Sequence, residues 1–222
     1  MTTAKKRVGI LISGRGSNMQ ALVEASRAED CPYEVVVVIA SRPDAAGLDW
    51  AKAQGLPALG LDHTRYESRE HLEGQLQTVL SASKVDLVAL AGFMRLMTAE
   101  FVERWRDRML NIHPSLLPAF KGLHTHEKSI AAGVRISGCT VHLVRPAMDE
   151  GPILGQAAVA VEYGDTAETL AARILIAEHK LYPAVLAAYA AGHISIVDER
   201  VSWRDPVNQG VTLFSPSLGR IG

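Results

Sequence analysis

Short aliphatic runs alternate with amphipathic segments along most of this chain. Residues 8–12 and 35–39 are apolar at nearly every position, which is typical of strands covered on both faces, as in parallel sheets. Similar runs recur at residues 86–91 and 109–112. A tight turn, Ser-Gly-Arg-Gly, follows the first run at residues 13–16. These four segments are predicted to be strands of one sheet.

The segments between the runs carry apolar residues at helical spacing. Helices are predicted from about Asn18, over residues 72–80, and after Thr98, which is a suitable N-cap. Their inward-facing residues are expected to be Met19, Leu22 and Val23 in the first, Leu72, Leu76, Val79 and Leu80 in the second, and Phe101, Val102 and Trp105 in the third.

Two further helices are predicted from their end signals. Asp44 is expected to cap a helix that Gly55 ends. Asp165, with an acidic residue three positions later, has the pattern of a capping box and is predicted to open a long helix. Pro183 is expected to kink or divide that helix, and Gly192 to end it.

The periodicity changes after residue 138. Residues 139–144 alternate and are expected to pair with residues 154–161 as a hairpin-like extension. The predicted fold is therefore α/β: a doubly wound, mostly parallel, Rossmann-like sheet with this C-terminal extension and the long helix. One domain is expected over residues 1–205, followed by a tail, 206–222, rich in glycine, serine and proline.

Charge and cysteine content narrow the class of protein. The chain has 23 basic and 24 acidic residues, a balance that argues against a nucleic-acid or membrane-surface partner. The two cysteines, Cys31 and Cys139, do not have a metal-like spacing. The polar start shows no secretory signal, and the apolar runs are far shorter than the roughly 20 residues of a membrane helix. We expect a soluble cytoplasmic protein.

Ligands of such sheets bind beyond the carboxyl ends of the strands. That rule selects residues 13–18, 92–97 and 111–118. The first segment opens like a dinucleotide-binding loop, but Met19 stands where the third glycine belongs, and it is not a P-loop either. A single phosphate at a helix N-terminus suits it. An ordinary tight turn explains the segment equally well.

Asn111 and His113 provide the most informative chemistry. Two residues apart at the end of a strand, their side chains share one face. An amide that stabilises an oxyanion beside an imidazole that transfers protons suits acyl transfer. The alternative is a capping Asn and a surface His. Asp149 could orient the imidazole. Residues 149–152 are also typical of an exposed turn, and spacing does not decide between these interpretations.

Other reactive residues form weaker patterns. His124 and His126, with His113 and His142, could suggest a metal site, but no zinc-binding motif accompanies them, so no metal is expected. Neither Ser115 nor Ser137 lies in a nucleophile elbow. A covalent serine mechanism is therefore not favoured.

Taken together, five segments resemble the phosphoribosylglycinamide formyltransferase family, folate-dependent enzymes of purine synthesis. They are residues 12–18, 90–95, 111–118 and 122–126, and the pair Glu178 and His179. The resemblance extends from about residue 8 to residue 203. The run Asn-Ile-His-Pro-Ser-Leu-Leu-Pro at 111–118 is specific to enzymes that handle 10-formyltetrahydrofolate, although it does not separate the members of that superfamily. The chain departs from the family pattern at Arg15, at residues 119–121 and after residue 205.

The resemblance implies a role for each matching residue. Asn111, His113 and Asp149 would be the catalytic trio. Glycinamide ribonucleotide would bind to Gly16, Ser17, Asn18 and Glu178. The pocket for the co-substrate 10-formyltetrahydrofolate would be lined by Arg69, Met94, Arg95, Leu96, Met97, Arg145, Pro146, Ala147 and Met148.

Three rival functions share features with this sequence. A 10-formyltetrahydrofolate hydrolase shares the 111–118 run but carries an N-terminal regulatory domain, for which a first strand beginning at Arg7 is expected to leave no room. Methionyl-tRNA formyltransferase has a further tRNA-binding domain, for which the chain is too short and its charge too balanced. A non-enzymatic nucleotide-binding module is permitted by the fold alone. Formyl transfer to glycinamide ribonucleotide is the favoured interpretation.

Overall fold

A computed structural model describes residues 4–204 and 215 of the chain. Its centre is a seven-stranded sheet with the order β3-β2-β1-β4-β5-β6-β7. The first five strands of this order pair in parallel, and the last two run antiparallel to their neighbours. The parallel strands are β1 (Lys6–Ile12), β2 (Tyr33–Ala40), β3 (Ala58–Gly60), β4 (Leu87–Leu90) and β5 (Met109–His113). The predicted α/β sheet is confirmed.

The hairpin expected after residue 138 is β6 (Ile136–Leu143) and β7 (Ile153–Ala160), and its antiparallel pairing is confirmed. This hairpin extends the main sheet. Strand β6 also pairs with β5, with Asn111 opposite His142 and His113 opposite Thr140. Strand β6 is an inner strand and is buried at every position after Ile136. The alternation of polar and apolar residues in its sequence therefore does not correspond to an alternation of exposed and buried side chains.

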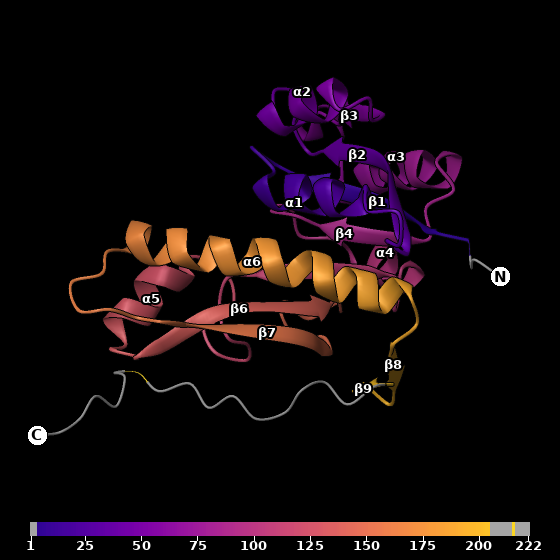
Figure 1. The fold of residues 1–222 in the computed structure, drawn as a ribbon. Helices are drawn as coiled ribbons and strands as arrows, with labels where there is room; N and C mark the ends of the chain where they lie inside the picture. The colour runs from indigo at the N-terminus through magenta and orange to yellow at the C-terminus, as the bar shows by residue number, and fades with distance from the viewer. Residues whose placement is uncertain (1–3, 205–214, 216–222) are drawn as a thin grey trace, which may run out of the picture.

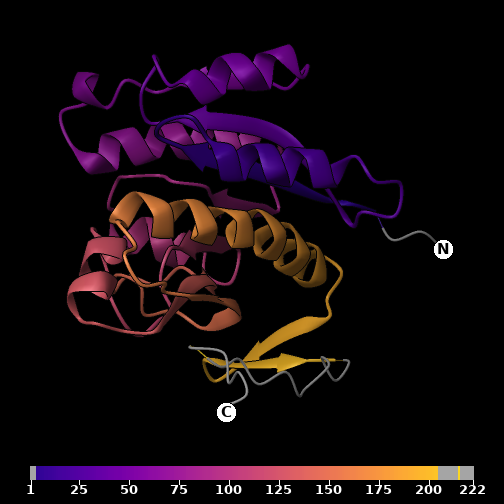
Figure 2. The same ribbon diagram turned by 60° about the vertical axis from the view of Figure 1, so that its left-hand side comes forward.

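Helices cover both faces of the sheet (Figures 1 and 2). One face packs against α1 (Ser17–Ser26), α2 (Ala46–Ala53) and the long α6 (Ala167–Ala190), and α5 (Thr125–Ala131) lies against α6. The other face packs against α3 (Arg69–Ala82) and α4 (Ala99–Arg104). A short 3-10 helix, η1 (His63–Arg65), precedes α3. Each fully buried aliphatic side chain in these two cores stabilises the fold by about 1.5–3 kcal/mol.

Helix α6 is also fixed to the sheet by a polar contact. The hydroxyl of Tyr182, fully buried, donates toward the carbonyls of Leu90 (3.2 Å) and Leu110 (3.1 Å). Leu90 is the last residue of β4, and Leu110 is the second residue of β5. The long helix therefore holds together the two strands from which the candidate site begins.

Helix ends agree with the sequence in part. Thr98 caps α4 by accepting the backbone N–H of Phe101. Gly55 and Gly192 follow the ends of α2 and α6 with positive φ, as expected of C-terminal glycines. Pro183 lies inside α6 without dividing it.

Two N-cap predictions are wrong by one residue. Ala45, rather than Asp44, precedes α2, and the Asp44 carboxylate instead pairs with Arg42 at 2.7 Å. At α6 the capping box is formed by Thr166 and Thr169, whose side chains and backbone N–H groups bond reciprocally. Asp165 stands just outside the helix and accepts from the Thr169 hydroxyl.

The chain continues into an unpredicted hairpin, β8 (Ile194–Val197) and β9 (Arg200–Trp203), which forms a separate two-stranded sheet. The predicted tail, residues 206–222, lies outside the described residues except for Ser215. Within the described part of the chain, no helix is both long and apolar enough to cross a membrane.

Candidate active site

The three loops selected from the sequence meet at the carboxyl edge of the sheet, because β1, β4 and β5 are neighbours. The backbone N–H of Met94 donates to the Ser13 hydroxyl at 2.8 Å, which joins the first loop to the second. The Ser13 and Ser41 hydroxyls share a further hydrogen bond of 2.7 Å. A ligand at this edge would contact segments far apart in the sequence.

The turn after β5 is tied to β6 through Thr140, a fully buried residue. Its hydroxyl donates to the Ser115 carbonyl at 2.7 Å and accepts the Leu117 backbone N–H at 3.0 Å. These bonds hold the chain where it leaves the sheet. As a result, His113 at the strand end has a fixed backbone.

Asp149 reaches His113, which spacing alone could not establish. The Asp149 Oδ2 atom lies 3.5 Å from His113 Nδ1, and both side chains are about nine-tenths buried. The same oxygen accepts the backbone N–H of Gly122 at 2.8 Å. Asp149 has a φ of 57°, a left-handed conformation that non-glycine residues seldom adopt. The loop therefore holds this carboxylate against the imidazole despite local strain.

Both ring nitrogens of His113 face oxygen acceptors. On the side opposite Asp149, His113 Nε2 lies 3.0 Å from the carbonyl of Phe120. A neutral imidazole can donate to only one of these oxygens, whereas an imidazolium can donate to both. The ring of His113 is therefore placed between a carboxylate and a carbonyl oxygen.

His142 completes the cluster and was not assigned a role from the sequence. Its Nδ1 lies 2.9 Å from the Leu143 carbonyl, and its Nε2 lies 3.2 Å from Asn111 Nδ2. These contacts assign a neutral ring that donates from Nδ1 and accepts at Nε2 from the Asn111 amide. The cross-strand pairing of Asn111 with His142 brings them together, and only the β5–β6 register could have revealed it.

The electrostatics of His142 agree with that neutral tautomer. Burial lowers the pKa of His142, more than the Leu143 carbonyl and the Asp149 charge raise it. Asp149 Oδ1 is 3.8 Å from His142 Nε2. These two groups would form an ion pair only if the imidazole were protonated. We favour the neutral ring, because Nε2 already accepts from Asn111. The amide of Asn111 is thereby oriented, and its second N–H stays available for a ligand.

Asn18 and Glu178 are brought together from α1 and α6. Asn18 Nδ2 donates to Glu178 Oε2 at 2.7 Å, and both side chains are buried. Burial raises the pKa of Glu178, while the Asn18 hydrogen bond lowers it. The side-chain amide oxygen of Asn18, Oδ1, is buried without a hydrogen-bond partner among the described residues. A buried acceptor of this kind favours a donor supplied by a ligand.

Gly16 precedes α1 with a φ of 69°, and no side chain caps the helix there. The first backbone N–H groups of α1, beginning at Ser17, therefore point toward the loop without a capping partner. Together with the helix dipole, they provide an environment that favours an anion. The predicted phosphate side of the site has this geometry.

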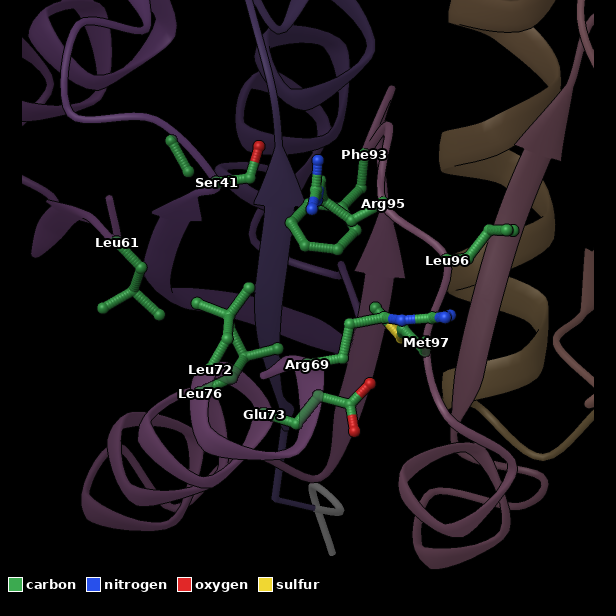
Figure 3. Close-up of a pocket in the computed structure, with 11 residues that line it drawn as sticks. Ser41, Leu61, Arg69, Leu72, Glu73, Leu76, Phe93, Arg95, Leu96 and Met97 are labelled. Carbon is green, nitrogen blue, oxygen red and sulfur yellow. The ribbon is translucent and has the colours of Figure 1, made fainter. Parts of the chain in front are cut away.

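Arg69, Arg95, Leu96 and Met97 line one cavity together with Phe93 (Figure 3). The floor of the cavity is apolar and comes from β2, α3 and the loop after β4. Met94 and Met148 are 69% and 53% exposed, and Pro146 and Ala147 are also exposed. The predicted folate-lining residues thus lie on two loops that flank the strand ends, apart from Arg69, which is the first residue of α3.

Arg145 departs from this group. Its guanidinium turns to Asp107 and Glu199, so the loop offers a ligand only the backbone and stem of this residue. Among residues 4–204, no three His, Cys, Asp or Glu side chains gather in an arrangement suited to a metal ion.

Comparisons with known proteins agree on one family. The family described as formyl transferase matches residues 6–186. The phosphoribosylglycinamide formyltransferase of Escherichia coli strain K12 is 38% identical over 88% of this chain and 92% of its own length. The human trifunctional purine biosynthetic protein adenosine-3 is 42% identical over 90% of this chain, which spans only 20% of that longer protein.

Solved structures give the same result. Glycinamide ribonucleotide transformylase 1 from Symbiobacterium toebii superposes with a TM-score of 0.87 at 46% identity, covering 90% of this chain and 94% of that one. A formyltetrahydrofolate deformylase from Pseudomonas syringae has a TM-score of 0.83 at 21% identity, covering 91% of this chain and 67% of that one. The second likeness shows the fold alone.

Proposed function

The chain belongs to the formyl transferase family, and from this membership we propose that it transfers the formyl group of 10-formyltetrahydrofolate to the amine of glycinamide ribonucleotide. The products are formylglycinamide ribonucleotide and tetrahydrofolate, a step of purine synthesis. We propose that one formyltransferase domain over residues 1–205 carries this activity. Both reactants are substrates in this reaction. The protein itself contributes binding, orientation and proton transfer.

The observation that carries the proposal is the convergence of Asn111, His113 and Asp149 at the end of β5. Asn111 is oriented by His142 at 3.2 Å, and Asp149 lies 3.5 Å from His113. An amide, an imidazole and a carboxylate in this order provide an oxyanion donor, an acid–base group and its orienting partner. A binding module has no need of this arrangement.

The proposed chemistry is direct transfer. The substrate amine attacks the formyl carbon, a C–N bond forms, and the carbonyl electron pair moves onto the formyl oxygen. The free N–H of Asn111 and an N–H of His113 stabilise that oxygen. As the bond from the formyl carbon to folate nitrogen breaks, Asp149 and His113 relay the amine proton toward the leaving nitrogen. No covalent enzyme intermediate is required.

Access to His113 requires a local movement. The Phe120 carbonyl occupies the Nε2 side of the ring at 3.0 Å, where the formyl oxygen would have to bind. We infer that substrate displaces this carbonyl, because the two oxygens compete for one N–H. Lys121, next to it, pairs with Glu150 at 2.8 Å, so the segment rests on the Asp149 loop until it moves.

We propose that the ribonucleotide occupies the α1 side of the site. Its phosphate would lie against the N–H groups following Gly16 and Ser17, and its ribose against Asn18 and Glu178. Asn18 Oδ1, for which residues 4–204 provide no hydrogen-bond partner, supports this assignment, since a ribose hydroxyl is a suitable donor.

The folate is proposed to lie between the loops that carry Met94, Arg95, Leu96 and Met97 on one side and Pro146, Ala147 and Met148 on the other. Exposed methionines provide adaptable apolar contact for a flat ring. Arg69 and Arg95, which share the cavity of Figure 3, are suitable cations for the folate carboxylates. Arg145 would contribute through its backbone.

Other expectations remain proposals. The two cysteines, Cys31 and Cys139, are free and buried, which fits the reducing cytoplasm proposed for this enzyme. We also propose that it needs no metal and acts on small molecules rather than nucleic acid. Hydrolysis of 10-formyltetrahydrofolate is the alternative activity; it has less support, because the relatives that match over most of both chains are named formyltransferase or transformylase.

The deciding experiment follows formyl loss from 10-formyltetrahydrofolate by absorbance, with and without glycinamide ribonucleotide. Transfer predicts a rate that depends on the amine substrate and equimolar formation of formylglycinamide ribonucleotide. A rate that is unchanged when the ribonucleotide is omitted indicates hydrolysis instead. Binding of either compound without turnover indicates a binding module.

A further inference from the structure

The turn of the C-terminal hairpin is strained. Val197 pairs with Arg200, which leaves Asp198 and Glu199 as a two-residue turn with φ values of 49° and 59°. Such a turn needs positive φ at both central positions and normally uses Asn-Gly or Asp-Gly. Glu199 occupies the position that glycine prefers. Backbone strain of this kind persists where the surrounding contacts hold it in place.

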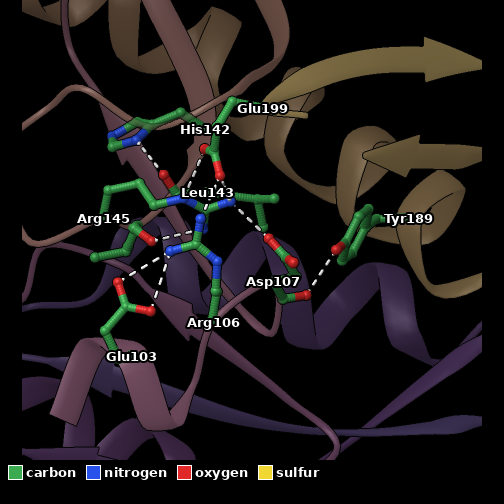
Figure 4. A network of polar contacts seen from close by, with 9 residues as sticks. Glu103, Arg106, Asp107, His142, Leu143, Arg145, Tyr189 and Glu199 are labelled. Atoms are coloured by element: carbon green, nitrogen blue, oxygen red, sulfur yellow. Dashed lines mark hydrogen bonds and ion pairs between the residues drawn. The ribbon is translucent and has the colours of Figure 1, made fainter. Parts of the chain in front are cut away.

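Those contacts come from Arg145, at the start of the loop that carries Asp149. Arg145 Nε and Nη2 lie 2.8 and 3.3 Å from the two Glu199 oxygens, a forked contact, and Arg106 pairs with the same carboxylate (Figure 4). Arg145 Nη2 also donates to Asp107 Oδ1 at 2.6 Å. The Arg145 side chain is only 8% exposed. A buried guanidinium is thus neutralised by two carboxylates.

Asp107 is fixed in turn. Its φ is 57°, and its backbone carbonyl accepts the Tyr189 hydroxyl of α6 at 2.6 Å. Arg145 Nη1 donates to the Val144 carbonyl at 3.1 Å. The guanidinium is therefore held from the hairpin, from the segment before β5 and from its own loop, and is directed away from the candidate site.

The stem of Arg145 connects this network to Asp149. The loop is closed at its base by the Leu143 N–H, which donates to the Pro152 carbonyl at 3.0 Å. The returning arm packs tightly: a Cβ on Gly151 would lie 1.7 Å from the Leu143 carbonyl and 3.2 Å from Arg145 Cγ. Gly151 is two residues after Asp149. Because Gly151 packs against the aliphatic part of the Arg145 side chain, fixing that side chain restricts the positions that the nearby Asp149 can adopt.

We propose that Glu199, together with Asp107, is a positioning residue for formyl transfer: it fixes Arg145 and through it the 146–151 loop that presents Asp149 to His113. This inference rests on the proposed function. It assigns to the C-terminal hairpin a part in the reaction although the hairpin lies outside the main sheet. Because the same loop carries Pro146, Ala147 and Met148, loss of the network is expected to weaken folate use as well as turnover.

The test is Glu199→Gln, which keeps the shape of the side chain and removes its charge. We expect kcat to fall about tenfold and KM for 10-formyltetrahydrofolate to rise several-fold, because small misplacements at a reacting centre have large effects on rate. KM for glycinamide ribonucleotide should stay within about twofold, since α1 and α6 hold that substrate. Glu103→Gln is the matched control, because Glu103 pairs with Arg106 and does not contact Arg145.

Two further measurements separate positioning from general stability. In an Arg145→Met background, Glu199→Gln should have no additional effect on kcat, because Glu199 acts through Arg145. Asp107→Asn, which loosens the opposite edge of the guanidinium, should reproduce the KM change even if Glu199→Gln does not fold. Equal constants for Glu199→Gln, Glu103→Gln and the wild type would overturn the proposal and leave the proposed function intact.

Failure of the proposed function would look different, since the wild type itself would show no transfer. Amide hydrogen exchange of residues 146–151 then still tests the network. Glu199→Gln should speed exchange there and leave exchange in α1 unchanged. Unchanged hydrogen exchange in residues 146–151 contradicts the proposal, whether or not the wild type transfers a formyl group.

Discussion

At the scale of single residues, the site depends on which nitrogen of each imidazole carries a proton. His142 is held neutral by burial and by the bond from Asn111, whereas His113 lies between the Asp149 carboxylate and the Phe120 carbonyl. The two histidines are therefore suited to different tasks. His142 orients the amide, and proton transfer is the task proposed for His113.

The neutral state of His142 predicts a pH dependence of stability. Because burial lowers its pKa below the ordinary value of 6.5, the unfolded chain binds more protons below that pH. The free energy of unfolding should be unaffected by this group above about pH 6.5 and fall as the pH decreases from there toward the folded pKa, at most about 1.4 kcal/mol per pH unit.

His142→Gln removes this contribution. Its unfolding free energy, measured by urea titration between pH 7 and pH 5, should decrease less steeply than that of the wild type. His193→Gln, at an exposed position, is the control and should retain the wild-type slope. Identical slopes for His142→Gln and the wild type would show that His142 is not held neutral.

At the scale of elements, the glycines that end or interrupt helices differ in what they require. Gly74 lies inside α3 and is exposed, and a Cβ there would meet nothing within 4 Å. Gly74→Ala is expected to stabilise the protein by about 0.5–1 kcal/mol through helix propensity and the lower entropy of the unfolded chain. Gly55 also has open space around it, but its φ is +78°.

Gly55→Ala is therefore the matched control and should destabilise the protein, because alanine is strained at that φ. Thermal unfolding of the two variants should show shifts of opposite sign. Shifts of the same sign would mean that backbone conformation does not control these positions.

Most elements could be predicted from the sequence, because periodicity reports burial directly. The strands near residues 8, 35 and 109 and the helix capped by Thr98 are examples. The helix starts predicted at Asp44 and Asp165 are each displaced by one residue. At α6 two capping residues, Asp165 and Thr166, stand side by side and backbone geometry selects the second, whereas at α2 the Asp44 carboxylate pairs with Arg42 and no side chain caps the helix. The β8–β9 hairpin was missed because its Asp-Glu turn lacks the residues that signal one.

The candidate site was predicted to a similar extent. Asn111 and His113 follow from their place at a strand end, but His142 depends on the β5–β6 register, which is a tertiary property. The direction of the Arg145 guanidinium likewise depends on Glu199, more than fifty residues later. Local sequence cannot specify contacts of this kind.

At the scale of the whole molecule, the site lies where the sheet changes direction. The parallel part provides the α1 loop, and the strands β5 and β6 provide Asn111, His113 and His142. Helix α6 crosses both parts (Figure 1), and its Glu178 side chain accepts a hydrogen bond from Asn18 of α1. Substrate binding should therefore stabilise the folded molecule as a unit.

Glycinamide ribonucleotide at about 100 times its Kd is expected to stabilise the protein by about 2.7 kcal/mol, a rise in Tm of roughly 5–10 °C. Glu178→Gln should show a smaller rise at the same concentration, because the proposed ribose contact is weakened. Glu168→Gln, at an exposed position of the same helix, should respond like the wild type. An undiminished rise in Glu178→Gln would exclude Glu178 from the ribonucleotide site.

The most direct test of the central claim is the single-turnover rate of formyl transfer by Asp149→Asn at saturating concentrations of both substrates. The amide keeps the size of the side chain but cannot hold the charge that faces His113. We predict a rate lower than the wild type by on the order of 10²–10⁴-fold, with an unchanged unfolding transition. A folded Asp149→Asn enzyme that transfers the formyl group at nearly the wild-type rate would contradict the account.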